Sequence, residues 1–416
     1  MRVLMLSWEY PPVVVGGLGR HVHAVARHLA AQGHDVVVLC RHEAGTDALT
    51  HPTEDGRHDG VRVIRVAEDP THLVFEKDLV AWTLAMGHAM IRAGLALLGG
   101  WHPDVVHAHD WLVTHPAVAL AEQAGAPLVA TVHATEAGRH SGWLSQPLNQ
   151  QVHSVEWWLA NRADAVITCS SAMRAEVAHL FEVDPAGITV IHNGIEPRDW
   201  RVPPRAVRAA RAAYSVEGAP LLLFFGRLEW EKGVHDLIAA LPRIRASHPG
   251  TRLVVAGKGS QSGALLELSR KLRVRRAVDF VGHLSDTELV ATLSAADAVV
   301  LPSRYEPFGI VALEAAAVGA PLVASTAGGL GEVVVEGETG VSFAAGDVEG
   351  IAAGVRRVLD DPGGARRRAR AAKARLPVDF SWELIATQTA GVYASAVVGE
   401  RVLLGRPKIA TGNAFG

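Results

Sequence analysis

Two glutamates eight residues apart mark the part of the sequence best suited to chemistry. Glu306 lies in the polar segment 303–309, after a short apolar run, and Glu314 lies in the alanine-rich segment that follows. A carboxylate can accept hydrogen bonds from two neighbouring hydroxyl groups, so the pair could bind a sugar and a ribose diol. Either residue could instead be a structural charge at a helix N-terminus or on an exposed helix face. The apolar surroundings of Glu314 favour a functional role, because a buried carboxylate needs a partner.

Backbone amides in the same segment offer a second kind of donor. Pro307, Phe308 and Gly309 lead into Ile310, where we expect a helix over residues 310–318. The N-terminus of a helix carries partial positive charge and unpaired N–H groups, which suit a diphosphate or sugar hydroxyls. The segment therefore predicts a substrate-binding helix N-terminus.

Two cations five residues apart form another candidate group. Arg227 and Lys232 share a glycine-containing segment that follows an apolar run. The planar guanidinium and the compact ammonium suit a pyrophosphate, and they could stabilise a departing diphosphate in a transition state. The alternative is a surface network of ion pairs with Glu229 and Glu231.

The first half of the chain supplies further candidates. Gly16 and Gly17 would let the backbone approach a phosphate or a sugar, although their spacing matches neither a dinucleotide fingerprint nor a P-loop. A simple tight turn explains them equally well. His109, Asp110 and His133 are expected near strand ends, where we interpret them as polar groups lining a sugar pocket. A structural role is the alternative for each histidine.

The many histidines also raise the question of a metal. We expect His107 and His109 to point to opposite faces of their strand, and no H-E-x-x-H motif occurs. The sequence therefore predicts no metal site and no cofactor.

These candidates follow short apolar strands that alternate with amphipathic helices. In the first half of the chain we expect strands over residues 2–7, 36–40, 61–66, 105–107, 128–132 and 165–168. In the second half we expect them over residues 221–225, 253–256, 280–281, 298–301 and 321–324. The alternation is typical of parallel sheets covered on both faces, where ligands bind beyond the carboxyl ends of the strands.

The segment between the two halves is rich in Arg and Pro and poor in strand signal, which predicts a domain boundary there. We expect an N-terminal domain over residues 1–200 and a second domain over residues 201–385. A C-terminal helix over residues 386–400 is expected to pack back toward the first domain, and a loose tail is expected over residues 401–416.

Composition narrows the class of protein. The 416 residues are 49% hydrophobic and 20% charged, with a formal net charge of -3, which indicates a globular chain without a basic footprint. Nucleic acid is therefore not an expected partner. Cys40 and Cys169 are expected to be reduced thiols in a cytoplasmic protein. We find no run of about 18 apolar residues and expect no membrane span.

Together, the motifs resemble those of the retaining glycosyltransferases of family 4, in the glycogen-synthase-like superfamily. The residues that carry the resemblance are Gly16-Gly17-Leu18, His109-Asp110, His133, Asn193-Gly194, Gly226-Arg227 with Lys232, and the pair Glu306 and Glu314. The resemblance implies the GT-B fold, an α/β architecture in which two Rossmann-like doubly wound domains face each other across a cleft. It places the acceptor on the first domain and the sugar nucleotide on the second.

The resemblance also implies a role for each candidate residue. Arg227 and Lys232 would hold the diphosphate and Glu314 the ribose, while Glu306 would contact the donor sugar and His133 would line the reacting face. These roles make Glu306, His133, Arg227 and Lys232 the catalytic candidates. The substrate-binding candidates are Gly16, Gly17, His109, Asp110, Asn193, His283 in the segment that receives the base, Pro307, Phe308, Gly309, Ile310 and Glu314.

Segments 7–12, 81–88 and 133–140 look like those of actinobacterial α-1,4-glucosyltransferases. This resemblance implies transfer of glucose from UDP-glucose or ADP-glucose to an α-glucan, with retention of configuration. The product would be glycogen or a methylglucose lipopolysaccharide precursor. Val14 replaces the lysine of the K-x-G-G-L motif of the main bacterial glycogen synthases, and Phe308 replaces a common cysteine, so the base stays open. The alternatives are another family 4 enzyme, such as a maltose-1-phosphate synthase or a mannosyltransferase, and a non-catalytic sugar-nucleotide-binding protein. The oligomeric state is also open, and a homodimer is one option.

Overall fold

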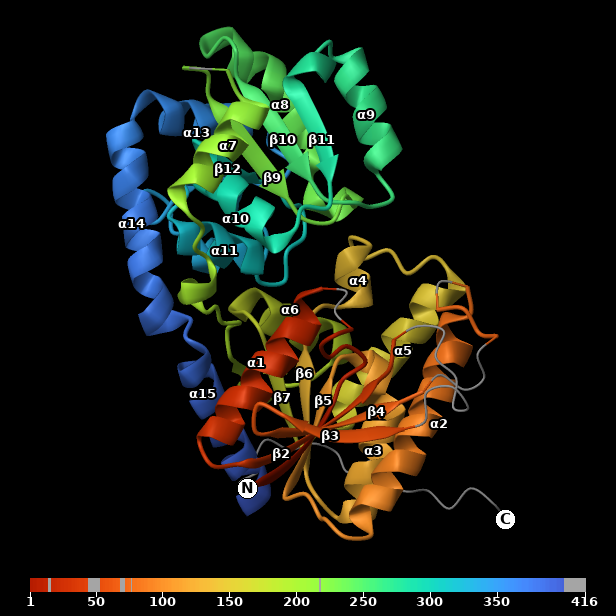
Figure 1. Ribbon diagram of the computed structural model, residues 1–416. Helices are drawn as coiled ribbons and strands as arrows, with labels where there is room; N and C mark the ends of the chain where they lie inside the picture. The colour runs from red at the N-terminus through yellow and green to blue at the C-terminus, as the bar shows by residue number, and fades with distance from the viewer. Residues whose placement is uncertain (14–15, 44–52, 68–71, 76, 217, 400–416) are drawn as a thin grey trace.

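The computed structural model describes residues 1–13, 16–43, 53–67, 72–75, 77–216 and 218–399. Within these residues the chain forms two α/β domains, which Figure 1 shows one above the other. Each domain is built on its own sheet, and the two sheets share no strand. The predicted class of two doubly wound α/β domains is confirmed.

The first sheet has eight strands in the order β3-β4-β2-β1-β5-β6-β7-β8. Only β3 runs antiparallel to its neighbour, β4. The strands are β1 (Arg2–Leu6), β2 (Asp35–Arg41), β3 (Glu54–His58), β4 (Val61–Val66), β5 (Val105–His109), β6 (Leu128–Val132), β7 (Ala165–Thr168) and β8 (Ile188–Val190). The central strands are apolar and buried because helices cover both faces of the sheet.

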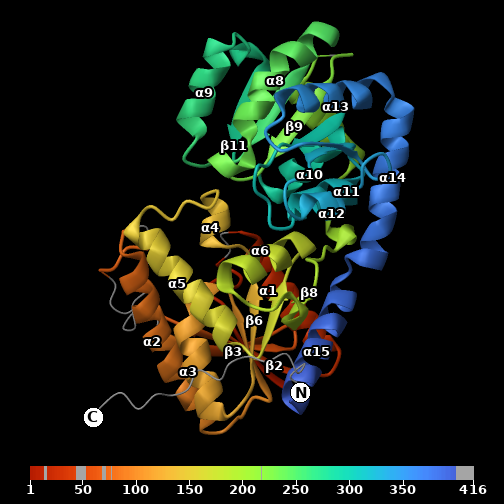
Figure 2. The same cartoon turned by 180° about the vertical axis from the view of Figure 1, so that it is seen from behind.

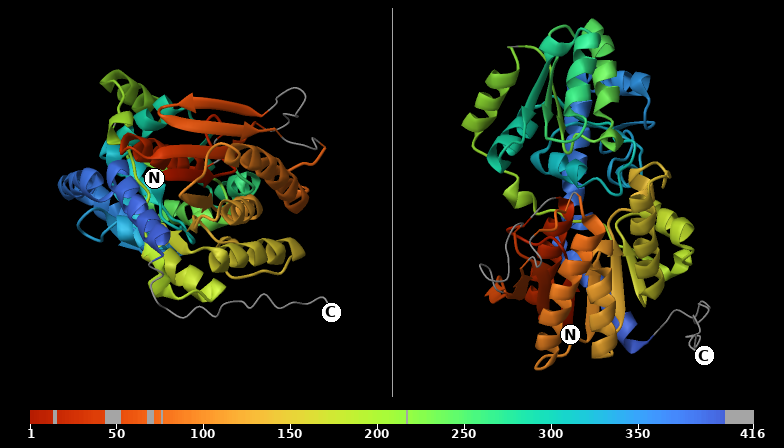
Figure 3. Two further views of the ribbon diagram at one scale, coloured as in Figure 1. Left: turned by 90° about the horizontal axis from the view of Figure 1, so that it is seen from below. Right: turned by 90° about the vertical axis from the view of Figure 1, so that its right-hand side faces the viewer.

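Helices form a layer on each side of this sheet. Helices α1 and α15 pack together on one side, whereas α2 packs against α3, and α3 against α5, on the other (Figures 1 and 3). The helices of this domain are α1 (Gly17–Ala31), α2 (Leu79–Leu98), α3 (Thr114–Ala124), α4 (Glu136–Arg139), α5 (Pro147–Arg162) and α6 (Ser171–Phe181).

The second sheet has six parallel strands in the order β11-β10-β9-β12-β13-β14. They are β9 (Leu221–Phe225), β10 (Arg252–Ala256), β11 (Val278–Gly282), β12 (Ala298–Leu301), β13 (Leu322–Ser325) and β14 (Val341–Phe343). The helices of this half are α7 (Pro204–Tyr214), α8 (Val234–Ser247), α9 (Ser262–Lys271), α10 (Asp286–Ala295), α11 (Ile310–Val318), α12 (Leu330–Val333), α13 (Val348–Asp360) and α14 (Pro362–Asp379). The domain has a second apolar core between its sheet and helices such as α8 and α13.

The last helix, α15 (Trp382–Val398), leaves the second domain and packs along α1 of the first (Figure 2). It begins four residues before the expected position, residue 386, because the Ser381 side chain accepts a hydrogen bond from the Leu384 amide and caps its N-terminus. The tail expected over residues 401–416 lies outside the described residues.

The chain passes between the domains twice, and the two passages touch each other. The Ile195 amide donates a hydrogen bond to the Phe380 carbonyl oxygen at 2.9 Å. Beside them, a Cβ atom on Gly194 would lie 2.7 Å from side-chain atoms of both Trp382 and Ile385. The two passages therefore form one packed unit.

Helix α2 corrects one detail of the sequence analysis. By length and composition this helix could cross a membrane, although we expected no such stretch. Its buried side chains, which include Trp82, Met86 and Met90, belong to a helix that packs against α3, β2 and β4. A core helix of a globular domain has the same apolar character, which explains the overlap.

Candidate functional site

The candidate residues of both domains lie on the sides of the domains that face each other. His109 ends β5, His133 follows β6, Arg227 follows β9, and Glu306 follows β12. Figure 1 shows that the carboxyl ends of the two sheets point toward each other. Ligands of open α/β sheets bind at these ends.

Lys232 and Glu306 form an ion pair at the centre of the second domain's contribution. Lys232 Nζ lies 2.9 Å from Glu306 Oε2, and the two side chains are only 16% and 12% exposed. Because β9 and β12 are neighbours in the sheet, the segments that follow them meet and bring these residues together. The ion pair holds the two side chains in place against each other.

Arg227 is more exposed than Lys232 and has a different ion-pair partner. Its guanidinium is 57% exposed and donates to Glu231 Oε1 at 3.1 Å, so an ion pair considered as the alternative is present. The other guanidinium donors have no partner among the described residues, and they could receive an anion.

Sequence reasoning missed the contacts that hold the Glu306 segment. Arg304 donates two hydrogen bonds to the Asp236 carboxylate, at 2.7 and 2.9 Å. The amides of Arg304 and Tyr305 both donate to the Glu231 carbonyl oxygen. The segments that carry Lys232 and Glu306 are thus fixed to each other by backbone and by ionic contacts.

The expected helix N-terminus is present, because α11 begins at Ile310 with Gly309 as its N-cap. The amides of Phe308, Gly309 and Ile310 have no acceptor among the residues that the structure describes. The Phe308 ring, in contrast, is 2% exposed and packs near Phe380, so any substrate contact of this residue is through its backbone. The Pro307 carbonyl oxygen accepts a hydrogen bond from Ser170 Oγ of the first domain.

Glu314 has the partner that its apolar surroundings require. Its carboxylate is almost fully buried in α11, and Arg20 Nη1 of α1 donates to it at 2.9 Å. Arg20 is 60% exposed, so the pair joins a buried carboxylate of one domain to an exposed guanidinium of the other. The alternative of an exposed helix residue is wrong.

We expect donor affinity to fall as the pH drops below neutrality, because burial raises the pKa of Glu314 to about 7 although Arg20 opposes the shift. In the role that the resemblance implies, ribose hydroxyls would donate to the ionised carboxylate, so donor binding would lower this pKa, and affinity would be retained above it and lost below it. The loss approaches about tenfold per pH unit.

Titrations of intact UDP-glucose and ADP-glucose between about pH 5.5 and 8.5 measure this slope. Glu314→Gln should weaken binding and remove most of the slope, whereas the control Glu349→Gln, at a side chain 67% exposed on α13, should keep it. An unchanged slope in Glu314→Gln would assign the pH dependence to another group.

The histidines of the first domain correct another expectation. His107 and His109 point to the same face of β5, with ring centroids 4.1 Å apart, because residues two apart on a strand share a face. His107 is buried between the Tyr393 hydroxyl and Thr131 Oγ1, which gives it a structural role. His109 Nδ1 lies 3.2 Å from His133 Nε2.

Asp110 holds the backbone of His133 in place. It is buried, and its Oδ1 accepts a hydrogen bond from the His133 amide at 2.7 Å. Its backbone has φ 63°, a left-handed conformation that is rare outside glycine and occurs at functional sites. Burial raises the pKa of Asp110 to about 6.

A histidine that the sequence analysis did not single out lies in the same group. His21 of α1 is buried and donates through Nδ1 to Asn193 Oδ1 at 2.7 Å. Its ring centroid is 4.7 Å from that of His133. Nothing in the sequence around His21 forms a motif, so only the fold reveals it. Asn193, a substrate-binding candidate, is thereby engaged in positioning a histidine.

The remaining candidates lie at the edges of the group. The Gly16 amide donates to Glu9 Oε2 at 3.0 Å, and a Cβ on Gly17 would lie 2.7 Å from the Ile310 side chain of the other domain. Gly17 and Ile310 therefore meet across the interface. His283, expected near the base, is exposed after β11.

Further contacts hold the two domains against each other. The Tyr305 hydroxyl donates to Glu176 Oε1 at 2.8 Å, and Ser170 Oγ donates to the Pro307 carbonyl oxygen at 2.6 Å. Glu332 accepts hydrogen bonds from the first two amides of α6, both at 3.1 Å. A negative charge at that helix N-terminus is stabilised by the helix dipole.

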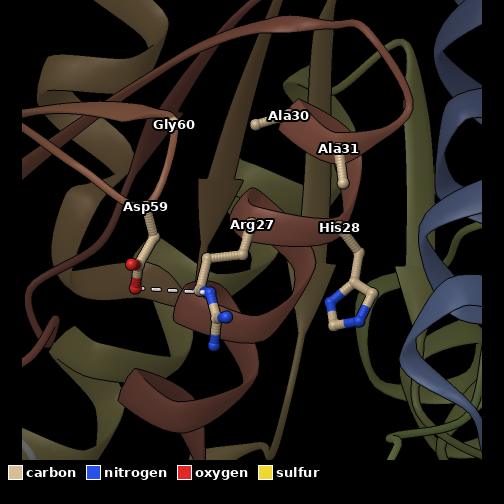
Figure 4. A pocket seen from close by; sticks show the side chains of 6 residues that line it. All are labelled: Arg27, His28, Ala30, Ala31, Asp59 and Gly60. Atoms are coloured by element: carbon tan, nitrogen blue, oxygen red, sulfur yellow. Dashed lines mark ion pairs between the residues drawn. The ribbon is translucent and has the colours of Figure 1, made fainter.

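A surface hollow of about 320 Å³ lies elsewhere, at the far end of α1. Figure 4 shows that Arg27 and Asp59 face each other there, beside His28 and Gly60. None of the candidate residues lines this hollow, where Arg27 and Asp59 form an ion pair with each other. The hollow is therefore separate from the group of candidate residues between the domains.

Comparison with known proteins accounts for this arrangement. A family model described as Glycosyltransferase Family 4 matches residues 15–199, and one described as Glycosyl transferases group 1 matches residues 208–375. A glycogen synthase of Mycobacterium tuberculosis is 60% identical over 406 residues, which cover 96% of each chain. The chain belongs to glycosyltransferase family 4. This family 4 glycosyltransferase is an enzyme that transfers hexosyl groups, so the alternative of a non-catalytic binding protein is set aside.

One further sequence relative and one solved structure resemble the family 4 enzyme over most of its length. An α-maltose-1-phosphate synthase of Mycolicibacterium smegmatis is 34% identical, over 94% of this chain and 99% of the other. Among solved structures, a sucrose-phosphate synthase from Thermosynechococcus elongatus has a TM-score of 0.80 and 25% identity, and the match covers 96% of this chain and 99% of that one. The predicted GT-B fold of the family 4 enzyme is confirmed.

Proposed function

We propose that this enzyme transfers glucose, with retention of configuration, from UDP-glucose or ADP-glucose to an α-1,4-glucan. The observation that carries the proposal is the 60% identity to a glycogen synthase across 96% of both chains. The identity to the α-maltose-1-phosphate synthase is much lower, at 34%. The proposal gives the second domain the sugar nucleotide and the first domain the acceptor.

The geometry supports a reaction in which departure of the diphosphate is assisted by fixed positive groups. As the bond from the sugar to the diphosphate breaks, negative charge develops on the leaving oxygen. Lys232 Nζ, the guanidinium of Arg227 and the unpaired amides at the start of α11 can stabilise that charge. A departing phosphate oxygen can then accept the acceptor's hydroxyl proton on the same face of the sugar, which retains the configuration.

Metal-independent transfer forms part of the same proposal. The cations and amides just described supply the positive charge that a divalent ion would otherwise bring to a diphosphate. A cytoplasmic location is also proposed, since Cys40 and Cys169 are buried unpaired thiols, as a reducing compartment allows.

Product analysis tests the proposed reaction. The enzyme is incubated with a maltooligosaccharide and either UDP-glucose or ADP-glucose, with a chelator present, and the glucan length is measured. Lengthening by α-1,4-linked glucose with at least one donor is the expected result. A parallel reaction with glucose 1-phosphate as acceptor tests the maltose-1-phosphate alternative. Failure of both donors to lengthen the glucan would remove the proposal.

A further inference from the structure

His21, His109 and His133 bring three ring nitrogens together, all within 4.8 Å of one another. Among the residues that the structure describes, this is the one group of three or more histidine, cysteine or acidic side chains with such a geometry. We propose that these three histidines form a binding site for Zn²⁺ or a similar divalent transition metal, and that a bound ion withholds His133 from the substrate. Such an ion is an inhibitor of the enzyme and takes no part in transfer.

The distances suit a metal of this size. Two nitrogens bound to one tetrahedral Zn²⁺ lie about 3.3 Å apart, given Zn–N bonds of about 2.0–2.1 Å. His109 Nδ1 and His133 Nε2 are already 3.2 Å apart. The His21 ring is the third member, with its centroid 4.7 Å from that of His133 and 5.6 Å from that of His109. Small ring rotations would therefore complete a three-nitrogen site.

Hydrogen bonding prepares one of the ligands. His21 Nδ1 donates to Asn193 Oδ1, which leaves Nε2 of the neutral ring as the atom with a free electron pair. Metal-binding histidines usually have such an outer partner, which fixes the tautomer and the ring orientation. Asn193 thus has the position of a residue that orients a metal ligand.

His109 supplies an independent observation. Its side chain is fully buried, and its Nε2 atom has no hydrogen-bond partner among the described residues. If His109 donates to His133, Nε2 is an unpaired acceptor, and if it accepts, Nε2–H is an unpaired donor. A buried unpaired nitrogen is costly, so the His109 ring lacks a full set of hydrogen-bond partners among the described residues.

The electrostatics select the kind of ion. Burial lowers the pKa of His133 to about 4 and that of His21 and His109 well below its usual range, so all three rings are neutral near pH 7 and can act as ligands. An all-nitrogen set suits Zn²⁺, Cu²⁺, Ni²⁺ or Co²⁺, whereas Mg²⁺ and Ca²⁺ prefer oxygen. His133 is partly exposed, which gives an ion a route into the site.

Calorimetric titration of the full chain with ZnCl₂, without sugar nucleotide, tests the site independently of the proposed function. We expect one tight Zn²⁺ per chain and no comparable binding of Mg²⁺. His21→Gln and His109→Gln should each weaken the tight binding at least about tenfold, and Asn193→Ala should weaken it about tenfold to hundredfold. Circular dichroism of each variant checks that it is folded, and the two ligand positions give two chances of a folded variant.

The control is His179→Gln, because His179 is an exposed histidine of α6 outside the group. It should leave the tight binding unchanged. Equal zinc binding by the wild type and both ligand variants would assign the ion to surface histidines and overturn the proposal, as would absence of tight binding. In the turnover assay, Zn²⁺ should inhibit and a chelator should restore the rate, and a fully active zinc-loaded enzyme would refute the inhibitory role.

Discussion

Replacing Lys232 by alanine should lower kcat by a factor of about 10²–10³ and raise the donor KM by a smaller factor. The ammonium group is held 2.9 Å from Glu306, in a position fixed by segments that follow two neighbouring strands. In the proposed reaction its interaction with the diphosphate would strengthen as negative charge develops, so its loss should affect the transition state more than the ground state. Steady-state kinetics with saturating glucan measure both constants.

The matched control is Lys271→Ala, which removes an exposed lysine at the end of α9. Its kinetic constants should equal those of the wild type. A second variant, Lys232→Arg, keeps the charge but changes its shape and reach, and it should recover only part of the lost rate. A kcat for Lys232→Ala within about a factor of two of the wild-type value would exclude Lys232 from transition-state stabilisation.

Replacing Gly233 by alanine should destabilise the protein by about 3 kcal/mol or more and also abolish most activity. Gly233 has φ 67° and follows Lys232 directly, and a Cβ atom there would overlap the carbonyl oxygen of Pro302. The overlap involves backbone on both sides, so relief requires movement of the segment that carries Lys232 or the one that carries Glu306. Stability and catalysis are therefore coupled at this glycine.

Gly319→Ala separates the cost of a left-handed backbone conformation from the cost of the overlap between the Cβ atom and its neighbours. Gly319 also has a left-handed backbone next to a helix, with φ 83°, but a Cβ atom there would meet nothing within 4 Å. It should cost only the conformational penalty of about 1 kcal/mol and leave activity unchanged. Chemical and thermal unfolding compare the two variants. Equal destabilisation would mean that the backbone at Gly233 moves aside without cost.

Local patterns predicted most elements of the fold. The helix expected over residues 310–318 has the same bounds in the structure, because glycines at both ends punctuate an apolar run. The strand β3 was missed since its residues, Glu54–His58, are polar and mostly exposed, and it exists only by pairing with β4 at the edge of the sheet. β8 and β14 have three residues each, too few to show a period.

The sequence could predict those candidate residues that follow directly after an apolar strand. The role of each residue in the reaction stays a prediction. Sequence alone could show that Glu314 needs a partner, but it could not name Arg20, which is 294 residues away. His21 was missed for the same reason. Both come from the amphipathic helix α1, whose sequence is explained by packing. The approach of the two domains brings Arg20 to Glu314, whereas the fold of the first domain brings His21 to His109 and His133.

The paired passages of the chain between the domains restrict how this enzyme can open. Since Ile195 and Phe380 are hydrogen-bonded to each other, the two passages form one connection, about which we expect the domains to rotate if the enzyme opens. Phe308, packed near Phe380, lies close to this connection. Figures 1 and 2 place α4 on the opposite side of the interface from α14 and α15. A rotation of the domains about the connection would therefore produce a large displacement at α4. If the enzyme opens in this way, we expect the proposed glucan acceptor to enter and leave from the α4 side.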